Sequence, residues 1–258
     1  MQMMGTDSVG YHERTVLGRE DDPVGNALEY YASRGETPMA WSGAGAARLG
    51  LEGEVDIDEW RAVFGVGGAR HPESGERLVH CMRPGMELVV SPHKSIAELG
   101  VIGRAEDMHT ILDAERDATM GYLDTVVQDQ GGRRGRAQLR TPTEGLTWAV
   151  SRHATTRAGD PQVHDHVLVA NLVRMGDERG GWKALDTGLL RDHLHAATAV
   201  GRMAAAAKAV ELGYGIEPDP GRSGRLGGWA ISGIPKQAWE VHANRSAQIE
   251  EAVGPDAS

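Results

Sequence analysis

The sequence predicts an α+β protein, in which a central antiparallel sheet carries helices packed on it. Two long segments, 105–130 and 190–212, have the apolar or alanine-rich pattern of helices. Short runs at 87–90, 146–151 and 164–173 have the length and composition of strands. A sheet covered by helices is the arrangement that this order of elements favours.

Shorter elements complete the expected order. Asp56 is a suitable N-cap for a helix over 56–64, residues 91–95 resemble a strand-to-helix turn, and Gly213 is suited to end the helix at 190–212. The other expected elements are helical turns at 26–34, a strand at 139–140 paired with 146–151 around a turn at 142–145, a strand at 182–184 across a turn at 176–181, a strand at 229–231 and a helix at 236–253.

Length and composition indicate an ordinary globular protein. The 258 residues suffice for one large or two small domains, and 40% apolar residues can form a core. The single cysteine, Cys81, excludes an internal disulfide framework and a thiolate-rich metal site. No apolar run reaches the ~18 residues of a membrane span, and no signal-peptide pattern is present. We therefore expect a cytoplasmic protein with no membrane segment, whose polar residues 1–25 form a flexible arm.

A formal net charge of −10 argues against a nonspecific polycation that binds nucleic acid. A local basic groove is still compatible with that charge. Four arginines gather in the segment GGRRGRAQLR, namely Arg133, Arg134, Arg136 and Arg140. They are either DNA contacts or part of a solvated hairpin turn, and composition alone does not decide between the two.

Three histidines stand close together in the stretch RHATTRAGDPQVHDHVLVAN, at His153, His164 and His166. Two residues apart on a strand, His164 and His166 project from the same face and can approach one ion. His153 can supply a third ligand from the preceding element. Three neutral nitrogens leave open positions on a divalent ion, which is typical of a catalytic metal site. The alternative is a set of strand histidines satisfied by other partners.

The residues around these histidines follow a longer pattern. It reads His, three residues, Arg, two residues, Asp-Pro-Gln, an apolar residue, His, one residue, His, then apolar residues and Asn. This chain places in it His153, Arg157, residues 160–162, Val163, His164, His166 and Asn171. An HxH pair alone is weak, but with the third histidine and the DPQ segment in register the block resembles the relaxase domain of the MobF family, in the HUH endonuclease superfamily.

Other segments extend the resemblance from about Tyr11 to Ile249. Tyr30 and Tyr31, followed by Trp41 and several glycines, resemble the tyrosine-bearing N-terminus of the family. Residues 86–95, MELVVSPHKS, resemble the family's Phe-Asp-Leu-Thr-Phe-Ser-Ala-Pro-Lys-Ser. Residues 180–186, 212–214 and 244–249 are also similar.

The resemblance implies an HUH relaxase-like fold and a defined reaction. Such domains nick and rejoin plasmid DNA at a transfer origin in conjugation, with strand and site specificity, through a 5′-phosphotyrosine intermediate. It implies a divalent ion on His153, His164 and His166, with Mg²⁺ or Mn²⁺ expected and Zn²⁺ or Ni²⁺ able to occupy the site in crystals. A bound ion lowers the barrier to attack on an anionic phosphodiester.

The implied partners are single-stranded or hairpin DNA at the transfer origin and accessory transfer proteins. Residues 1–258 would form the relaxase (DNA strand-transferase) domain. Because family members usually continue into a helicase-like region, such a region is expected downstream but is absent from this chain.

The identity of the nucleophile stays open. Many family members carry two tyrosine pairs, whereas this chain has one pair, Tyr30 and Tyr31, and a lone Tyr11 where the first pair would fall. A phenol has a pKa of about 10 and needs help to lose its proton. The resemblance maps the first nucleophile to Tyr11. Tyr30 or Tyr31 is then a second tyrosine, the nucleophile itself if Tyr11 is displaced, or a packing element.

Two other residues gain catalytic roles by resemblance. Glu87 stands where the family has Asp, so it is expected to orient a ligand imidazole or to accept the phenolic proton, the alternative being a solvent-facing carboxylate. Arg157 is expected to contact the scissile phosphate, or else to form a surface ion pair with Asp160. Lys94 joins the four clustered arginines as an expected DNA contact, because phosphate neutralisation carries much of the affinity for DNA.

Several nearby polar residues are expected to lie outside the chemistry. Asp165, between the two strand histidines, should point to the opposite side of the strand. His93 replaces a family proline and has no expected catalytic role, and His193 and His195 are expected to face solvent on a helix.

Two other function classes are compatible with the sequence. The first is a sequence-specific binding module for single-stranded or hairpin DNA with weak or no nicking, since the tyrosine region matches only in part and Glu replaces Asp. The second is a metalloenzyme that acts on small molecules, against which the arginine cluster and the lack of a carboxylate-rich ligand set argue.

Overall fold

The computed structural model describes residues 2–4, 37–127, 143–155, 160–176, 180–219 and 228–241. The fold divides into two compact units. Unit 1 comprises Met1–Val89, Met120–Arg152 and Asp165–Ala197, and unit 2 comprises Val90–Thr119, His153–His164 and Thr198–Ser258. The boundary passes through two continuous strands, β4 (Thr143–Thr155) and β5 (Pro161–Met175).

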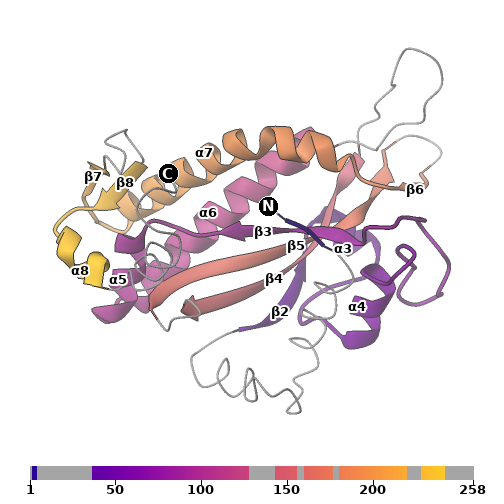
Figure 1. Cartoon of the computed structure of the whole chain (residues 1–258), viewed down its shortest axis with the longest axis horizontal. Helices are drawn as coiled ribbons and strands as arrows, with labels where there is room; N and C mark the ends of the chain where they lie inside the picture. The colour runs from indigo at the N-terminus through magenta and orange to yellow at the C-terminus, as the bar shows by residue number, and fades with distance from the viewer. Residues whose placement is uncertain are drawn as a thin grey trace, which may run out of the picture. The chain divides into compact units, whose positions relative to one another are not determined.

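Helices and strands are mixed along the chain (Figure 1). Besides β4 and β5, the elements are β1 (Gln2–Met4), β2 (Thr37–Ser42), α3 (Ala44–Arg48), α4 (Ile57–Val63), β3 (Gly85–Val90), α5 (Lys94–Val101), α6 (Ala105–Val126), β6 (Trp182–Lys183), α7 (Thr187–Glu211), β7 (Ile216–Asp219), β8 (Gly228–Ile231) and α8 (Lys236–Val241). None of the helices in the described part of the chain is long and apolar enough to cross a membrane.

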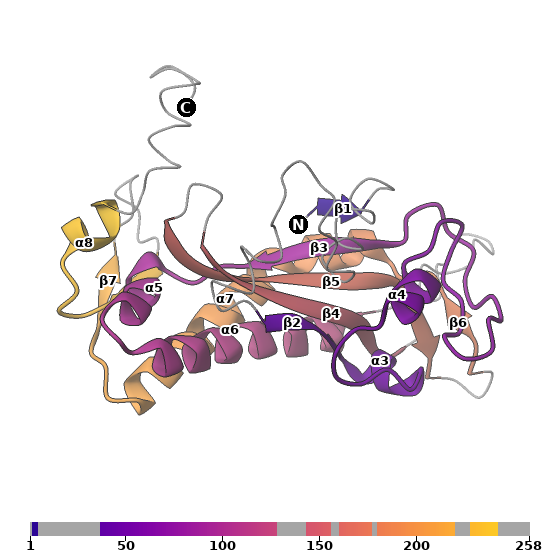
Figure 2. The same cartoon turned by 90° about the horizontal axis from the view of Figure 1, so that it is seen from below.

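The larger sheet contains six strands in the described residues, in the order β1-β3-β5-β4-β2, with β6 paired to β5. The pairings β1–β3, β2–β4 and β5–β6 are antiparallel. Only five residues, 156–160, join β4 to β5, which is too short for a parallel crossover, so these two strands form an antiparallel hairpin. Figure 2 shows β3, β5 and β4 side by side. The predicted α+β class with a central antiparallel sheet is confirmed.

Unit 1 has its own core, in which α3 and α4 pack with β2 and the middle of β5. The Trp60 and Phe64 ring centroids lie 4.2 Å apart, and both side chains are fully buried. Asp56 caps α4 as predicted: its carboxylate accepts the Asp58 and Glu59 N–H groups, and Glu59 in return accepts the Asp56 N–H. Glu59 also accepts the indole N–H of Trp41 at 2.8 Å, so this cap fixes α4 against β2.

In unit 2, α5 is capped by His93, whose Nδ1 accepts the Ser95 N–H at 3.2 Å. The Ser95 hydroxyl oxygen accepts the Ile231 N–H at 2.9 Å and so joins α5 to β8. Where α7 packs on α6, Gly201 permits a close approach: a Cβ there would lie 2.1 Å from Thr119 Oγ1 and 2.8 Å from the Glu115 carbonyl oxygen. The two-stranded β7–β8 ladder is antiparallel.

Some predicted elements were wrong. The turn expected at 142–145 is replaced by the start of β4, and Gly145 lies in that strand with φ +97°, where a Cβ would come 2.9 Å from the Ala44 Cβ. This glycine therefore serves a close packing contact. Strands β1, β2 and β7 and helix α3 were not predicted, and α6 ends at Val126. The segments expected at 26–34, 139–140 and 242–253 lie outside the described residues, as does all but β1 of the expected arm over 1–25.

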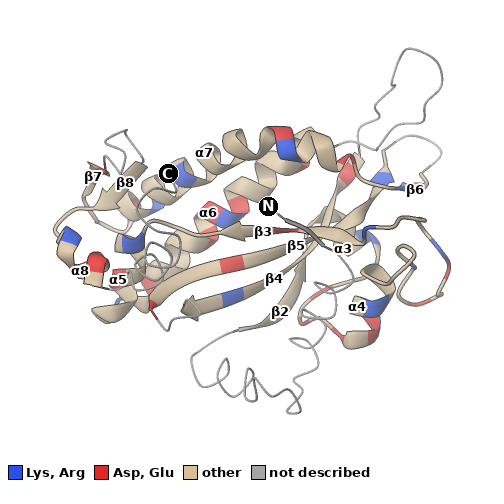
Figure 3. Ribbon diagram, viewed as in Figure 1, with Lys and Arg blue, Asp and Glu red and all other residues tan. Residues whose placement is uncertain are grey.

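Charged side chains are unevenly distributed over the elements. Figure 3 shows lysines, arginines and carboxylates mainly on helices and connecting segments, while strands β2, β4 and β5 carry few. The few charges on the strands therefore need a specific explanation.

Candidate metal centre

The hairpin of β4 and β5 brings the three predicted histidines together. His153 on β4 and His164 and His166 on β5 each offer one nitrogen, and the three nitrogens lie within 4.8 Å of one another. The His153 and His164 rings meet edge to face, with centroids 5.3 Å apart. His153 is 8% exposed and the other two are half-buried, so the cluster is sheltered but reachable.

Two of the imidazoles are oriented by hydrogen bonds on their Nδ1 side. His164 Nδ1 lies 2.8 Å from the Gln162 carbonyl oxygen, which can only accept, so a proton resides on Nδ1. His166 Nδ1 pairs with a carboxylate oxygen of Glu87. In a neutral ring this arrangement leaves Nε2 with the lone pair that a metal requires, and it fixes the ring orientation.

The donor set therefore fits a divalent ion. Three imidazole nitrogens from two paired strands, with a carboxylate and a carbonyl behind two of them, match sites that keep positions open for substrate. The Glu87 side chain is 16% exposed and bonded to His166, so the solvent-facing alternative does not describe it.

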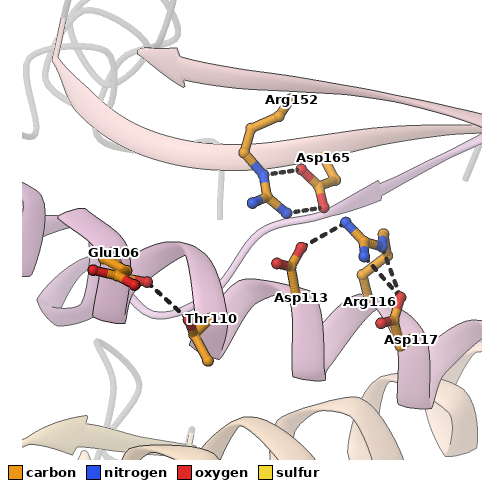
Figure 4. A network of polar contacts seen from close by, with 7 residues as sticks. All are labelled: Glu106, Thr110, Asp113, Arg116, Asp117, Arg152 and Asp165. Carbon is orange, nitrogen blue, oxygen red and sulfur yellow. Dashed lines mark hydrogen bonds and ion pairs between the residues drawn. The ribbon is translucent and has the colours of Figure 1, made fainter. Parts of the chain in front are cut away.

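Asp165 lies on the opposite side of β5 from the histidines, as predicted. Its side chain is fully buried, and its two carboxylate oxygens accept Nε and Nη2 of Arg152 at 2.7 Å each. Figure 4 shows the two side chains pointing toward each other from neighbouring strands. Sequence reasoning did not single out Arg152 for this pairing, because its partner is 13 positions away.

Two residues of the motif join β5 to segments next to other strands, a role that the sequence did not indicate. The Gln162 amide donates to Ser91 Oγ at 3.0 Å and to the Pro92 carbonyl at 3.3 Å, which ties the start of β5 to the end of β3. Asn171 donates to the Arg83 carbonyl at 2.9 Å and accepts the Leu185 N–H at 3.0 Å. The Asn171 amide donates and accepts at once, which explains this residue type at its position.

Lys94, an expected DNA contact, borders a cavity of about 320 Å³ in unit 2. Arg202 and Trp229 also line it, together with Gln162 and the buried Glu115. Two cationic side chains and an indole are suitable for contact with a nucleotide.

Several predicted site residues lie outside the described residues: Tyr11, Tyr30, Tyr31, Arg157, Arg133, Arg134, Arg136 and Arg140. Their roles stay predictions. Asp160, the alternative partner considered for Arg157, is 3% exposed.

Three histidines outside the cluster have distinct surroundings. His195 is exposed as expected, but the expectation for His193 was wrong: it is half-buried, with Nδ1 2.9 Å from the Tyr122 hydroxyl. His93 pairs with Asp219 through Nε2 at 3.1 Å, and burial lowers the pKa of its ring more than Asp219 raises it.

Comparisons with known proteins agree with this geometry. The family model described as TrwC relaxase matches residues 6–256. The multifunctional conjugation protein TraI of Escherichia coli is 30% identical over 256 residues, and TraI of strain K12 is 29% identical. Each alignment covers 91% of this chain, but the chain spans only 14% of the length of either relative.

Solved structures show the same fold at low sequence identity. A metal-bound structure of the conjugative relaxase TrwC in complex with oriT DNA has a TM-score of 0.78 at 23% identity, covering 99% of this chain and 83% of that one. TrwC complexed with a 27-mer DNA that comprises the recognition hairpin and the cleavage site has a TM-score of 0.76 at 22% identity, covering 99% and 84%.

Proposed function

Because the chain belongs to the TrwC relaxase family, we propose that it nicks and rejoins one strand of plasmid DNA at a transfer origin in conjugation. The observation that carries the proposal is the cluster of three histidine nitrogens on the β4–β5 hairpin. The names of the relatives support it, since TraI is a conjugation protein and TrwC was solved with oriT DNA.

We assign His153, His164 and His166 as ligands of a divalent ion. Of the two ions expected from the sequence, the donor chemistry favours Mn²⁺ over Mg²⁺, because imidazole suits transition ions whereas Mg²⁺ prefers oxygen ligands. Zn²⁺ and Ni²⁺ suit the same donors. When bound, the ion supplies Lewis-acid stabilisation to the oxygens of the scissile phosphodiester.

The protein's own side chains hold the site and supply the nucleophile. Glu87 accepts the Nδ1–H of His166 and keeps that ring oriented, which favours an orienting role over a role as base. In the proposed reaction the phenolate oxygen of Tyr11 bonds to phosphorus as the bond to the 3′ oxygen breaks, and a proton completes the 3′-OH. One phosphoester bond replaces another, so the reverse attack rejoins the strand.

Other predicted residues keep their roles within this proposal. Tyr30 or Tyr31 is the second tyrosine, or the nucleophile if Tyr11 is not. Arg157 contacts the scissile phosphate. Lys94 and the arginines at 133, 134, 136 and 140 contact the single-stranded or hairpin DNA, and the cavity beside Lys94 supports a DNA contact there. The proposed compartment is the cytoplasm, where such DNA and accessory transfer proteins would meet it.

The test is covalent capture of DNA. The protein, with Mn²⁺ or Mg²⁺, is incubated with end-labelled single-stranded DNA that contains the transfer origin of its own plasmid. We expect a protein–DNA adduct that is stable to denaturant, lost in Tyr11→Phe and lost in His164→Ala. His195→Ala, which changes an exposed histidine outside the cluster, is the matched control and should keep the adduct.

Other results would redirect the proposal. Loss of the adduct in Tyr30→Phe or Tyr31→Phe, with retention in Tyr11→Phe, would reassign the nucleophile. Tight binding with no adduct in any metal would instead identify a DNA-binding module. No DNA binding at all would favour a metalloenzyme for small molecules.

A further inference from the structure

A buried ion pair lies one residue away, along each strand, from the proposed ligands. Asp165 is fully buried and the Arg152 side chain is 11% exposed. The guanidinium meets both carboxylate oxygens at 2.7 Å, in a bidentate geometry that restricts both side chains to one arrangement. Asp165 occupies the position between two histidines that the family pattern leaves unspecified.

The ion pair and the contact between His153 and His164 both join β4 to β5. His153 directly follows Arg152 on β4, and His164 directly precedes Asp165 on β5. Successive side chains on a strand point to opposite faces, so the second pair faces away from the first. The edge-to-face contact of the His153 and His164 rings agrees with a cross-strand pair.

A shift of β5 along β4 would break the ion pair. A two-residue slip keeps each side chain on its face but moves Asp165 two positions along the strand away from Arg152. Asp165 would then hold a buried charge without its guanidinium, which is strongly unfavourable. A one-residue slip would turn the apolar side chains of β5 out of the core. Either slip would also separate His153 from His164.

We propose that Arg152 and Asp165 are positioning residues, whose ion pair fixes β4 against β5 in the register that assembles the three-histidine site. The inference rests on the proposed metal site but concerns how that site is built. Neither side chain contacts the ion or the DNA in this proposal.

The test separates positioning from simple stabilisation. In the double variant Arg152→Met with Asp165→Leu, an apolar pair of similar volume replaces the ion pair, and such exchanges often keep or raise stability. Arg152→Lys keeps the charge but loses the fork that binds both oxygens. Glu144→Gln is the matched control, because it removes a β4 carboxylate that lies 2.9 Å from Arg48.

The readouts are Co²⁺ affinity, the visible absorption spectrum of the Co²⁺ protein and the melting temperature. We expect the double variant to melt near the parent temperature, to bind Co²⁺ at least tenfold more weakly and to show an altered spectrum. Arg152→Lys should fold and bind Co²⁺ with an affinity between those of the parent and the double variant. Glu144→Gln should match the parent in all three readouts.

The positioning role is overturned if the double variant binds Co²⁺ with the parent's affinity and spectrum. If the double variant does not fold, the same result for Arg152→Lys overturns it. Failure of the proposed function is a separate result. In that case the parent itself would bind no Co²⁺, or would form no adduct with transfer-origin DNA.

Discussion

The hydrogen bond between Glu87 and His166 offers a quantitative test of the metal centre. Both side chains are mostly buried, with 16% and 19% exposed, so solvent screens the bond only in part. A hydrogen bond to a charged group contributes about 1.5–3 kcal/mol, against about 1 kcal/mol for a neutral one. In Glu87→Gln an acceptor oxygen remains but its charge is lost, which leaves a difference of about 0.5–2 kcal/mol. Because about 1.4 kcal/mol corresponds to tenfold, we expect metal binding to weaken by about 2- to 30-fold.

Removal of the whole carboxylate should have a larger effect. In Glu87→Ala we expect metal affinity to fall by about 10- to 100-fold, the range seen when a group that orients a ligand is lost. Calorimetric titration of the metal-free protein with Mn²⁺ measures both variants, and Glu217→Gln, at an exposed position on β7, serves as the control. An affinity for Glu87→Ala within twofold of the parent would refute the reasoning.

Three further predictions concern stability. Gly201→Ala should lower the free energy of unfolding in urea by about 1–3 kcal/mol, because its Cβ would lie 2.1 Å from Thr119 Oγ1. Gly121 has open space around it, so Gly121→Ala should raise the free energy of unfolding by about 0.5–1 kcal/mol. Equal effects of the two changes would contradict this. Asp56→Ala removes the cap of α4 and should lower the free energy of unfolding by about 1 kcal/mol. An unchanged midpoint of urea unfolding would count against this role of Asp56. Burial lowers the pKa of His93, so the folded state favours the neutral imidazole. The free energy of unfolding that this residue contributes should be complete above about pH 6.5, the pKa of a free histidine, and should decline as the pH falls below it. In His93→Gln the melting temperature should therefore differ less between pH 7 and pH 5 than it does in the parent.

Local signals in the sequence were sufficient for several elements. Asp56 as a suitable N-cap predicted α4, and the apolar run after His166 predicted β5. Edge strand β2 escaped prediction because Pro38 argues against a strand, although an edge position tolerates proline. The turn expected at 142–145 was wrong because glycine is common both in turns and at close packing contacts, and Gly145 belongs to the second kind.

Two of the three ligands were predictable because the spacing of His164 and His166 depends on the period of a single strand, and His153 followed from the longer motif. The supports of the metal cluster were less predictable. The Arg152–Asp165 pair depends on the register between two strands, and the Tyr122–His193 contact joins residues 71 positions apart. No periodic pattern along the chain encodes such a pairing; it emerges only once the strands and helices pack.

The position of His166 on β5 has a consequence for the metal-free protein. Directly after it, residues 167–173 are buried, and Leu168, Ala170 and Leu172 belong to the core of unit 1. The amide hydrogens of this stretch should exchange with solvent only when that core unfolds, with or without a chelator. Unlike a zinc finger, whose fold depends on its ion, this protein should therefore lose and regain its metal while the strand that presents His166 stays folded.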